Sequence, residues 1–342
     1  MVIRRLPAGS FAFVMASGIV STALAVVGWT VPSTVLLVIS VIALVVLGAL
    51  TVARVVLRRA DVMEEARNPG RAFGFFTIVA ALNVVGLRVY SPDAPGITIA
   101  LAVLSVPLWL LCSYGVPANL MLRPRTDPVA SDIDGSWFLW VVGTQSLATV
   151  TAVFAADPGN EELAAPAVAL WGIGVLLYLM LATLVTLRLL TVPSRPDNFN
   201  PSYWIYMGAT AITVLAGSTI VVLPADIPVV RATASVVSGL TYLLWAFGVW
   251  WVPLLVIFGL WRHVVHKVRM RYEAGLWSIV FPLGMYSVAS THFGLAAHLP
   301  LLVTIGEIDA GVAGVAWLAA AVAMVAAGVG RLRHGAPGRM VS

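Results

Sequence analysis

The sequence predicts an all-α membrane protein with ten transmembrane helices, and three observations support this fold class. The chain of 342 residues is 60% hydrophobic and only 10% charged, which is far too apolar for an ordinary soluble globule. Ten long apolar stretches alternate with short polar links, and each stretch can cross a hydrocarbon core of about 30 Å. All but two of the 20 Lys and Arg residues fall on alternate links or at the termini. That distribution follows the positive-inside rule.

The ten stretches define a single transmembrane domain over residues 1–342, because no link is long enough to form a soluble domain. The expected spans are 10–29, 33–56, 74–91, 96–121, 136–156, 164–190, 202–223, 229–261, 276–297 and 303–330. Helices are expected because every backbone amide in lipid must be satisfied within its own segment. A transmembrane barrel is excluded, since it needs alternating strands of about ten residues, whereas runs such as 35–50 and 164–187 are uniformly apolar.

Charge on the links predicts the orientation in the cell membrane, with both termini in the cytoplasm. The basic side carries Arg4, Arg5, Arg54, Arg58, Arg59, Arg67, Arg71, Arg123, Arg125, Arg188, Arg195, Arg262, Lys267, Arg269, Arg271, Arg331, Arg333 and Arg339. The opposite links carry acids, and only Arg88 and Arg231 depart from the pattern. The net charge of +5 then reflects loops facing anionic lipid, so no nucleic-acid partner is expected. We interpret the first span as a retained signal anchor, because no small-residue cleavage site follows it.

The hairpins formed by consecutive spans recur roughly every 65 residues, and their first helices open with aromatic clusters. These clusters are at 11–13, 73–76, 137–140 and 203–206, with a weaker match at 276–277. Five similar hairpins predict a quasi-fivefold ring around a central pore. The alternative is a set of unrelated aromatic belts at the membrane interfaces. The lone cysteine, Cys112, falls inside the fourth span, which excludes an intrachain disulfide and predicts a buried thiol.

Polar residues concentrate in the odd-numbered spans, which contain both mid-membrane amides. The expected pore-lining residues are Ser17, Ser21, Asn83, Gly86, Gln145 and Thr210. The second and tenth spans are almost purely aliphatic, although the eighth carries some hydroxyls. This contrast predicts odd helices around a polar axis and even helices against lipid. The alternative is that Gly, Ser and Thr merely allow close packing of helices.

Two segments resemble signatures of the tellurite-resistance/dicarboxylate transporter family, which includes the slow-type anion channels of plant guard cells. Residues 7–21 read PAGSFAFVMASGIVS, and residues 277–289 read WSIVFPLGMYSVA. The number of spans and the hairpin repeat also agree over nearly the whole chain. The resemblance implies a homotrimer in which the odd helices of each subunit line an anion pathway. It further implies that an aromatic side chain of the ninth helix, Phe281 in this sequence, plugs the pore.

The residues around Phe281 suit a gate. Pro282 cannot donate a backbone hydrogen bond and is expected to kink the ninth helix, and Gly284 leaves room beside it, so both are candidate hinge residues. A phenyl ring across a narrow pore blocks ions sterically and by excluding water. The alternative is that Phe281 is an ordinary packing residue, as most membrane phenylalanines are.

Few other residues suggest chemistry. Arg88 near the outer link is a candidate for attracting anions, or it snorkels and pairs with Asp93. His292 and His298 are titratable groups that a proton-coupled carrier would need, although histidines near an interface are usually unremarkable. His263 and His266 are spaced to share a metal, but their basic link favours a solvated stretch. We therefore expect neither a metal nor a cofactor.

The sequence lacks a zinc-protease motif, a phosphate-binding glycine loop and a pair of intramembrane aspartates, so an enzyme is not expected. The predicted function is an anion channel or transporter for small inorganic or organic anions. A proton-coupled carrier of C4-dicarboxylates such as malate, or an exporter of sulfite or tellurite, is the alternative. A membrane scaffold or a lipid-modifying enzyme is the non-transport alternative.

Overall fold

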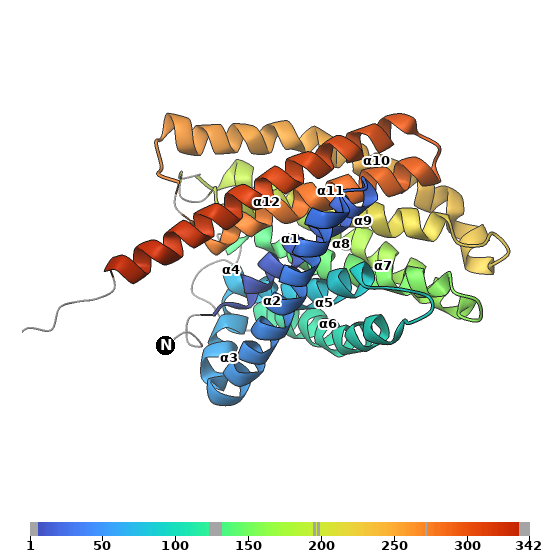
Figure 1. Cartoon of the computed structure of the whole chain (residues 1–342), viewed down its shortest axis with the longest axis horizontal. Coiled ribbons are helices and arrows are strands. Elements are labelled where there is room, and N and C mark those ends of the chain that lie inside the picture. The colour runs from blue at the N-terminus through green and yellow to red at the C-terminus, as the bar shows by residue number, and fades with distance from the viewer. Residues whose placement is uncertain (1–5, 123–131, 194–195, 197–198, 271, 335–342) are drawn as a thin grey trace, which may run out of the picture.

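The computed structural model in Figure 1 describes residues 6–122, 132–193, 196, 199–270 and 272–334, and these residues form helices and connecting turns without a strand. Ten continuous helical stretches, counted with the short helical turns that precede some of them, are long and apolar enough to span a membrane, which confirms the predicted number. Each stretch contains one main α-helix. These helices are α1 (Ala12–Val26), α2 (Thr30–Leu57), α5 (Phe76–Arg88), α6 (Gly96–Leu122), α7 (Leu139–Ala155), α8 (Ala164–Thr191), α9 (Ile205–Val221), α10 (Pro228–Leu260), α11 (Trp277–Ala296) and α12 (Pro300–His334). Arg4, Arg5, Arg123, Arg125, Arg195, Arg271 and Arg339 of the charge pattern lie outside the described residues.

The ten spans separate into an inner and an outer layer. In the spans that contain α1, α5, α7, α9 and α11, between 67% and 83% of the most apolar window is buried. In those that contain α2, α6, α8, α10 and α12, the buried share is only 11% to 33%. The outer helices expose Val, Leu and Ile side chains, which lipid tails solvate as well as protein does. The predicted division into inner odd spans and outer even spans is therefore present in the structure.

The inner helices contact one another in a closed cycle. Helix α1 packs against α5, α5 against α7, α7 against α9, α9 against α11, and α11 returns to α1. Each outer helix packs on the inner helix of its own hairpin, and α2, α6, α8 and α12 also contact the next inner helix in the cycle. In Figure 1, α12 (red) runs across α11 and α1, the two inner helices that it contacts.

Each inner helix is preceded by a short 3-10 turn, and the aromatic clusters of the repeat lie in these turns and in the first turn of the helices that follow. The 3-10 turns are η2 (Ala8–Phe11), η3 (Phe73–Phe75), η5 (Gly135–Phe138), η8 (Pro201–Trp204) and η10 (Ala274–Leu276). The aromatic rings pack between neighbouring repeats: the ring centroids of Phe73 and Trp137 are 4.7 Å apart, and those of Phe138 and Tyr206 are 4.6 Å apart. Phe73 and Phe138 are almost fully buried. These aromatics are therefore contacts between repeats and not an exposed interfacial belt.

A short helix, α3 (Arg59–Arg67), lies where the sequence predicts only a link, and it is hydrogen-bonded to the turn η2 that precedes α1. Its buried Glu65 forms an ion pair with Arg54 of α2, with 2.5 Å between Nη1 and Oε2. The other carboxylate oxygen of Glu65 accepts a hydrogen bond from the backbone N–H of Ala8 at 2.8 Å. This one carboxylate therefore joins the outer helix α2 to the beginning of the inner helix α1. Cys112 of α6 is a buried free thiol, as predicted.

Candidate functional site

A cavity of about 160 Å³ lies at the centre of the cycle of inner helices. All five inner helices contribute to its wall, which is formed by Ile19, Thr22, Val84, Leu87, Tyr90, Ser146, Thr149, Val153, Ile212, Leu215, Thr219, Met285, Val288 and His292. Most of these residues belong to the C-terminal halves of their helices, so the cavity occupies one half of the ring. Its volume is sufficient for a small ion with some of its water.

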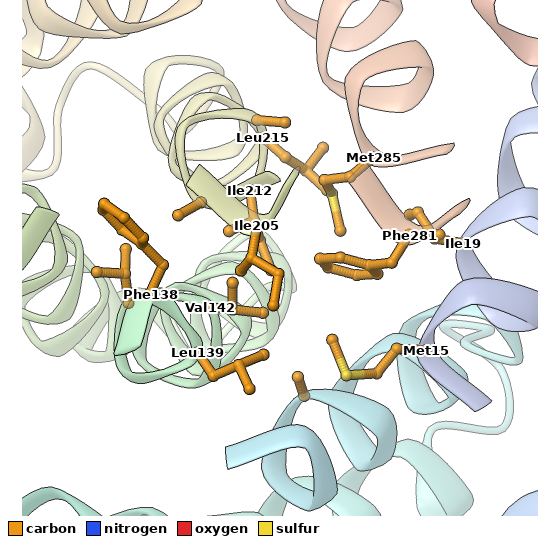
Figure 2. Close-up of a cluster of buried hydrophobic side chains, with 14 of the residues drawn as sticks. Met15, Ile19, Phe138, Leu139, Val142, Ile205, Ile212, Leu215, Phe281 and Met285 are labelled. Carbon is orange, nitrogen blue, oxygen red and sulfur yellow. The ribbon is translucent and has the colours of Figure 1, made fainter. Parts of the chain in front are cut away.

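Toward the N-terminal ends of the inner helices, apolar side chains fill the space within the ring. We call this layer the apolar plug, and it consists of Met15, Leu139, Val142, Ile205 and Phe281, all of which are buried. Figure 2 shows the ring of Phe281 pointing from α11 toward side chains of the opposite helices. Met285, one helical turn further along α11, belongs to the cavity wall. Phe281 therefore lies directly next to the closed end of the cavity.

The two candidate hinge residues are points where α11 approaches its neighbours closely. A Cβ atom added to Gly208 of α9 would lie 2.7 Å from Cγ of Pro282. A Cβ atom added to Gly284 would lie 3.0 Å from Cγ2 of both Ile19 and Val20 of α1. Helix α11 continues through Pro282 from Trp277 to Ala296. This packing holds the backbone around Phe281 tightly, so movement of the side chain needs less rearrangement than movement of the helix.

The two mid-membrane amides form hydrogen bonds between helices. Asn83 of α5 donates to Oγ of Ser146 at 3.0 Å and accepts from Oγ of Ser105 of α6 at 3.0 Å. Gln145 of α7 donates to the backbone carbonyl of Trp171 of α8 at 3.1 Å. Neither amide belongs to the cavity wall, although Ser146, which receives the hydrogen bond from Asn83, does.

The other expected lining residues also face the outer layer. Ser17 accepts a hydrogen bond from Nε1 of Trp317 of α12 at 2.9 Å, and Ser21 donates to the carbonyl of Ser33 of α2 at 2.7 Å. Thr98 of α6 donates to the carbonyl of Gly86, and Thr210 packs against Gly248 of α10. The residues Ser17, Ser21, Asn83, Gly86, Gln145 and Thr210 thus form a polar seam between the two layers, outside the described cavity wall.

Arg88, the expected anion-attracting residue, is directed into the same seam. Its Nε donates to Oγ of Ser21 at 3.1 Å, and its Nη2 donates to Oγ of Ser33 at 2.8 Å. These two hydroxyls come from α1 and α2, and Arg88 is not part of the cavity wall. A guanidinium near the end of a membrane helix needs such partners because hydrocarbon offers none.

At the rim of the cavity, Tyr90 donates its phenolic hydrogen to Asp157, which follows α7, with 2.6 Å between Oη and Oδ1. Burial raises the pKa of Tyr90 to about 12, and the hydrogen bond and negative charge of Asp157 act in the same direction. Tyr90 therefore stays protonated and neutral at physiological pH. The two residues connect the end of α5 to the end of α7.

The two histidines with metal-like spacing do not face one another as ligands. Nδ1 of His263 contacts the backbone oxygen of Val268, and Nδ1 of His266 contacts that of Trp261. Within the described part of the chain, no group of three His, Cys, Asp or Glu side chains is placed to hold a metal ion.

A cavity enclosed by helices that are long and apolar enough to span a membrane defines the class of this molecule, a polytopic membrane protein with an internal cavity. The family of voltage-dependent anion channels known as SLAC1 matches residues 5–325, and the chain belongs to this family. That match confirms the resemblance inferred from residues 7–21 and 277–289 and identifies an anion channel or transporter family over nearly the whole chain.

Relatives in other organisms agree with this assignment. An uncharacterized membrane protein of Mycobacterium tuberculosis is 51% identical over 158 residues, which are 45% of this chain and 80% of that protein. An uncharacterized transporter of Methanocaldococcus jannaschii is 30% identical over 122 residues, 36% of this chain and 34% of the relative. The first relative is named as a membrane protein and the second as a transporter.

Proposed function

We propose that this protein passes small anions across the membrane along the axis of the inner helices, and that Phe281 is the gate. The observation that supports this proposal best is the position of the cavity. It is bordered by all five inner helices and ends beside the apolar plug that contains Phe281. A pathway through the ring needs only the plug to open in order to continue beyond the cavity. In this proposal the five hairpins are quasi-fivefold equivalents.

The gate would act through size and hydration. The buried phenyl ring fills the axis where an anion would have to shed its water, so it raises both the steric and the dehydration barrier. Because Pro282 and Gly284 hold α11 against α9 and α1, opening would consist of a rotation of the ring and not a bend of the helix. The lining residues in this proposal are those of the cavity wall, and the polar seam serves to pack the two layers.

Replacing Phe281 tests the gate. Phe281→Ala should increase chloride efflux from proteoliposomes at least about tenfold, the effect of lowering a barrier by ~1.4 kcal/mol. Phe293→Ala is the matched control, because Phe293 is equally buried on the same helix and is not part of the cavity wall. Unchanged efflux from a well-folded Phe281→Ala protein would contradict the gate, and equal increases in both variants would indicate a general leak.

A proton-coupled carrier of C4-dicarboxylates is the second candidate, because His292 brings a titratable side chain to the cavity wall. A carrier would give saturable uptake of malate driven by a pH gradient, whereas a channel would give uncoupled conductance. Parallel flux assays with chloride, nitrate, malate, sulfite and tellurite separate these functions and include the oxyanion exporter. Chemical cross-linking in membranes tests the proposed homotrimer and would yield a trimeric band.

A further inference from the structure

The serine and threonine hydroxyl groups in the cavity wall use their hydrogens within their own helices. Thr22 donates to the carbonyl of Gly18, Ser146 to that of Gly143, Thr149 to that of Gln145 and Thr219 to that of Leu215, at 2.8 to 3.1 Å. Each hydroxyl has one hydrogen to donate. These side chains therefore present oxygen lone pairs and methyl groups to the cavity, and such groups do not attract an anion.

His292 differs from these residues because both of its ring nitrogens are free of hydrogen bonds to other described residues. Its side chain is partly accessible whereas Thr291 and Phe293 on either side are buried, and it contributes to the cavity wall. It shares the cavity-facing stripe of α11 with Met285 and Val288. Ser287 and Thr291 form a different stripe, which packs on Gly306 of α12.

Among the described residues of the cavity wall, His292 is the one that can carry a positive charge, because the charged side chains of the surrounding helices lie elsewhere. Arg88 of α5 is occupied by Ser21 and Ser33 in the seam, and Asp157 after α7 is occupied by Tyr90. Asp226 after α9 is exposed in its link, and His298 is exposed beyond the end of α11. Glu307 and Asp309 extend from α12, which packs on the Ser287 and Thr291 stripe. The described part of α1, residues 12–26, carries no titratable side chain.

We propose that His292 is a proton-operated anion site that controls entry into the pathway. Protonated, its ring carries a positive charge and two N–H donors toward the cavity, and it binds a small anion such as chloride or nitrate. Neutral, it leaves the cavity without a cation, and anions are no longer concentrated beside the plug. This inference rests on the proposed function, since it assigns a regulatory residue to the same pathway.

The sign of the pH dependence follows from the chemistry of imidazole. Protonation adds positive charge, so anion flux should rise as the pH falls and the imidazole becomes protonated. A charge in a cleft with low-dielectric walls raises the local concentration of counter-ions by about tenfold or more. Once the plug is opened by Phe281→Ala, the flux should therefore be about tenfold higher at low pH than at high pH.

The experiment measures chloride efflux from proteoliposomes with the same pH on both sides, varied across the histidine range. It uses the Phe281→Ala background so that the plug does not limit the flux. His292→Gln should abolish the rise at low pH, whereas His298→Gln, an exposed histidine outside the cavity wall, should retain it. A rise that persists in His292→Gln would overturn the site while leaving the proposed channel intact.

A binding measurement keeps the site testable if no variant conducts, an outcome that would overturn the proposed function alone. An anion that binds the folded and not the unfolded protein raises its melting temperature, and the rise is larger the tighter the anion binds at a given concentration. Nitrate should stabilise the wild-type protein at low pH more than at high pH, and this difference should vanish in His292→Gln. Equal stabilisation at both pH values, or in both proteins, would overturn the site independently of any flux.

Discussion

The seam between the two layers is more polar than the axis inside the inner layer. The composition of the odd spans had suggested the reverse, a polar axis. The seam holds both mid-membrane amides, Arg88 and several hydroxyls, all joined by hydrogen bonds between helices. The axis is occupied by the apolar plug and by a cavity whose hydroxyls are satisfied internally. Polar residues of a membrane helix thus serve first to attach it to its neighbours. We expect seam variants to change stability and axis variants to change flux.

The largest effect on stability is expected at the ion pair that fixes α2 and α3 to the start of α1. Arg54→Met leaves the carboxylate of Glu65 buried without its partner, which should lower the free energy of unfolding by about 3–5 kcal/mol. Denaturation in detergent measures this loss. The double variant Arg54→Met with Glu65→Gln should recover some of it, because no buried charge is then left unpaired. A loss that is as large in the double variant would show that packing and not charge is responsible.

A smaller loss of stability is expected where a glycine of an outer helix allows close packing in the seam. A Cβ atom on Gly174 of α8 would lie 2.2 Å from Nε2 of Gln145, inside the hydrogen bond to Trp171. Gly174→Val should therefore cost about 1–3 kcal/mol through overpacking. Gly172→Val is the control, since a Cβ atom there meets nothing within 4 Å on the same helix. The melting temperature of Gly174→Val should be clearly lower than that of Gly172→Val. Equal melting temperatures would contradict close packing at this point of the seam.

The smallest effect on stability is expected when a single polar side chain is replaced by an apolar one of similar size. Such replacements should also separate the two regions most clearly, since one region affects stability and the other affects flux. Asn83→Leu should lower stability by about 0.6–1.7 kcal/mol, the range for hydrogen bonds between membrane helices, and leave the anion selectivity of the flux unchanged. Thr149→Val in the cavity wall should alter the flux with little change in melting temperature. If Asn83→Leu changes selectivity more than Thr149→Val does, the assignment of the two regions must be reversed.

Much of the fold could be predicted from the sequence, because membrane insertion imposes a simple length and charge code. Continuous apolar runs such as 35–50 indicated the spans, and the scarcity of polar residues in them marked the outer layer. Helix α3 was missed because residues 59–67 were counted as a link, although Ala, Met, Glu and Arg are strong helix formers.

The direction of individual side chains in the inner helices could not be predicted, because these helices are buried on all sides and no face is marked by exposure. Ser17 and Ser21 share a helix face, yet they bond to different outer helices. A usable signal was present in the even spans. Ser33, Ser105 and Trp317 are polar groups in mainly apolar helices, and each is a partner of an inner residue. Pairing such residues by membrane depth would have identified the seam.

The cycle that brings α11 back to α1 leaves the inner wall without a free edge. In some transporters two halves rock against each other and expose the substrate to each side in turn. To move in this way, this protein would have to open two contacts between inner helices at the same time. One of them could be the contact of α11 with α1, where Gly284 approaches Ile19 and Val20. A closed ring of tightly packed helices resists such a separation. It favours transport through a fixed helical barrel in which only side chains move.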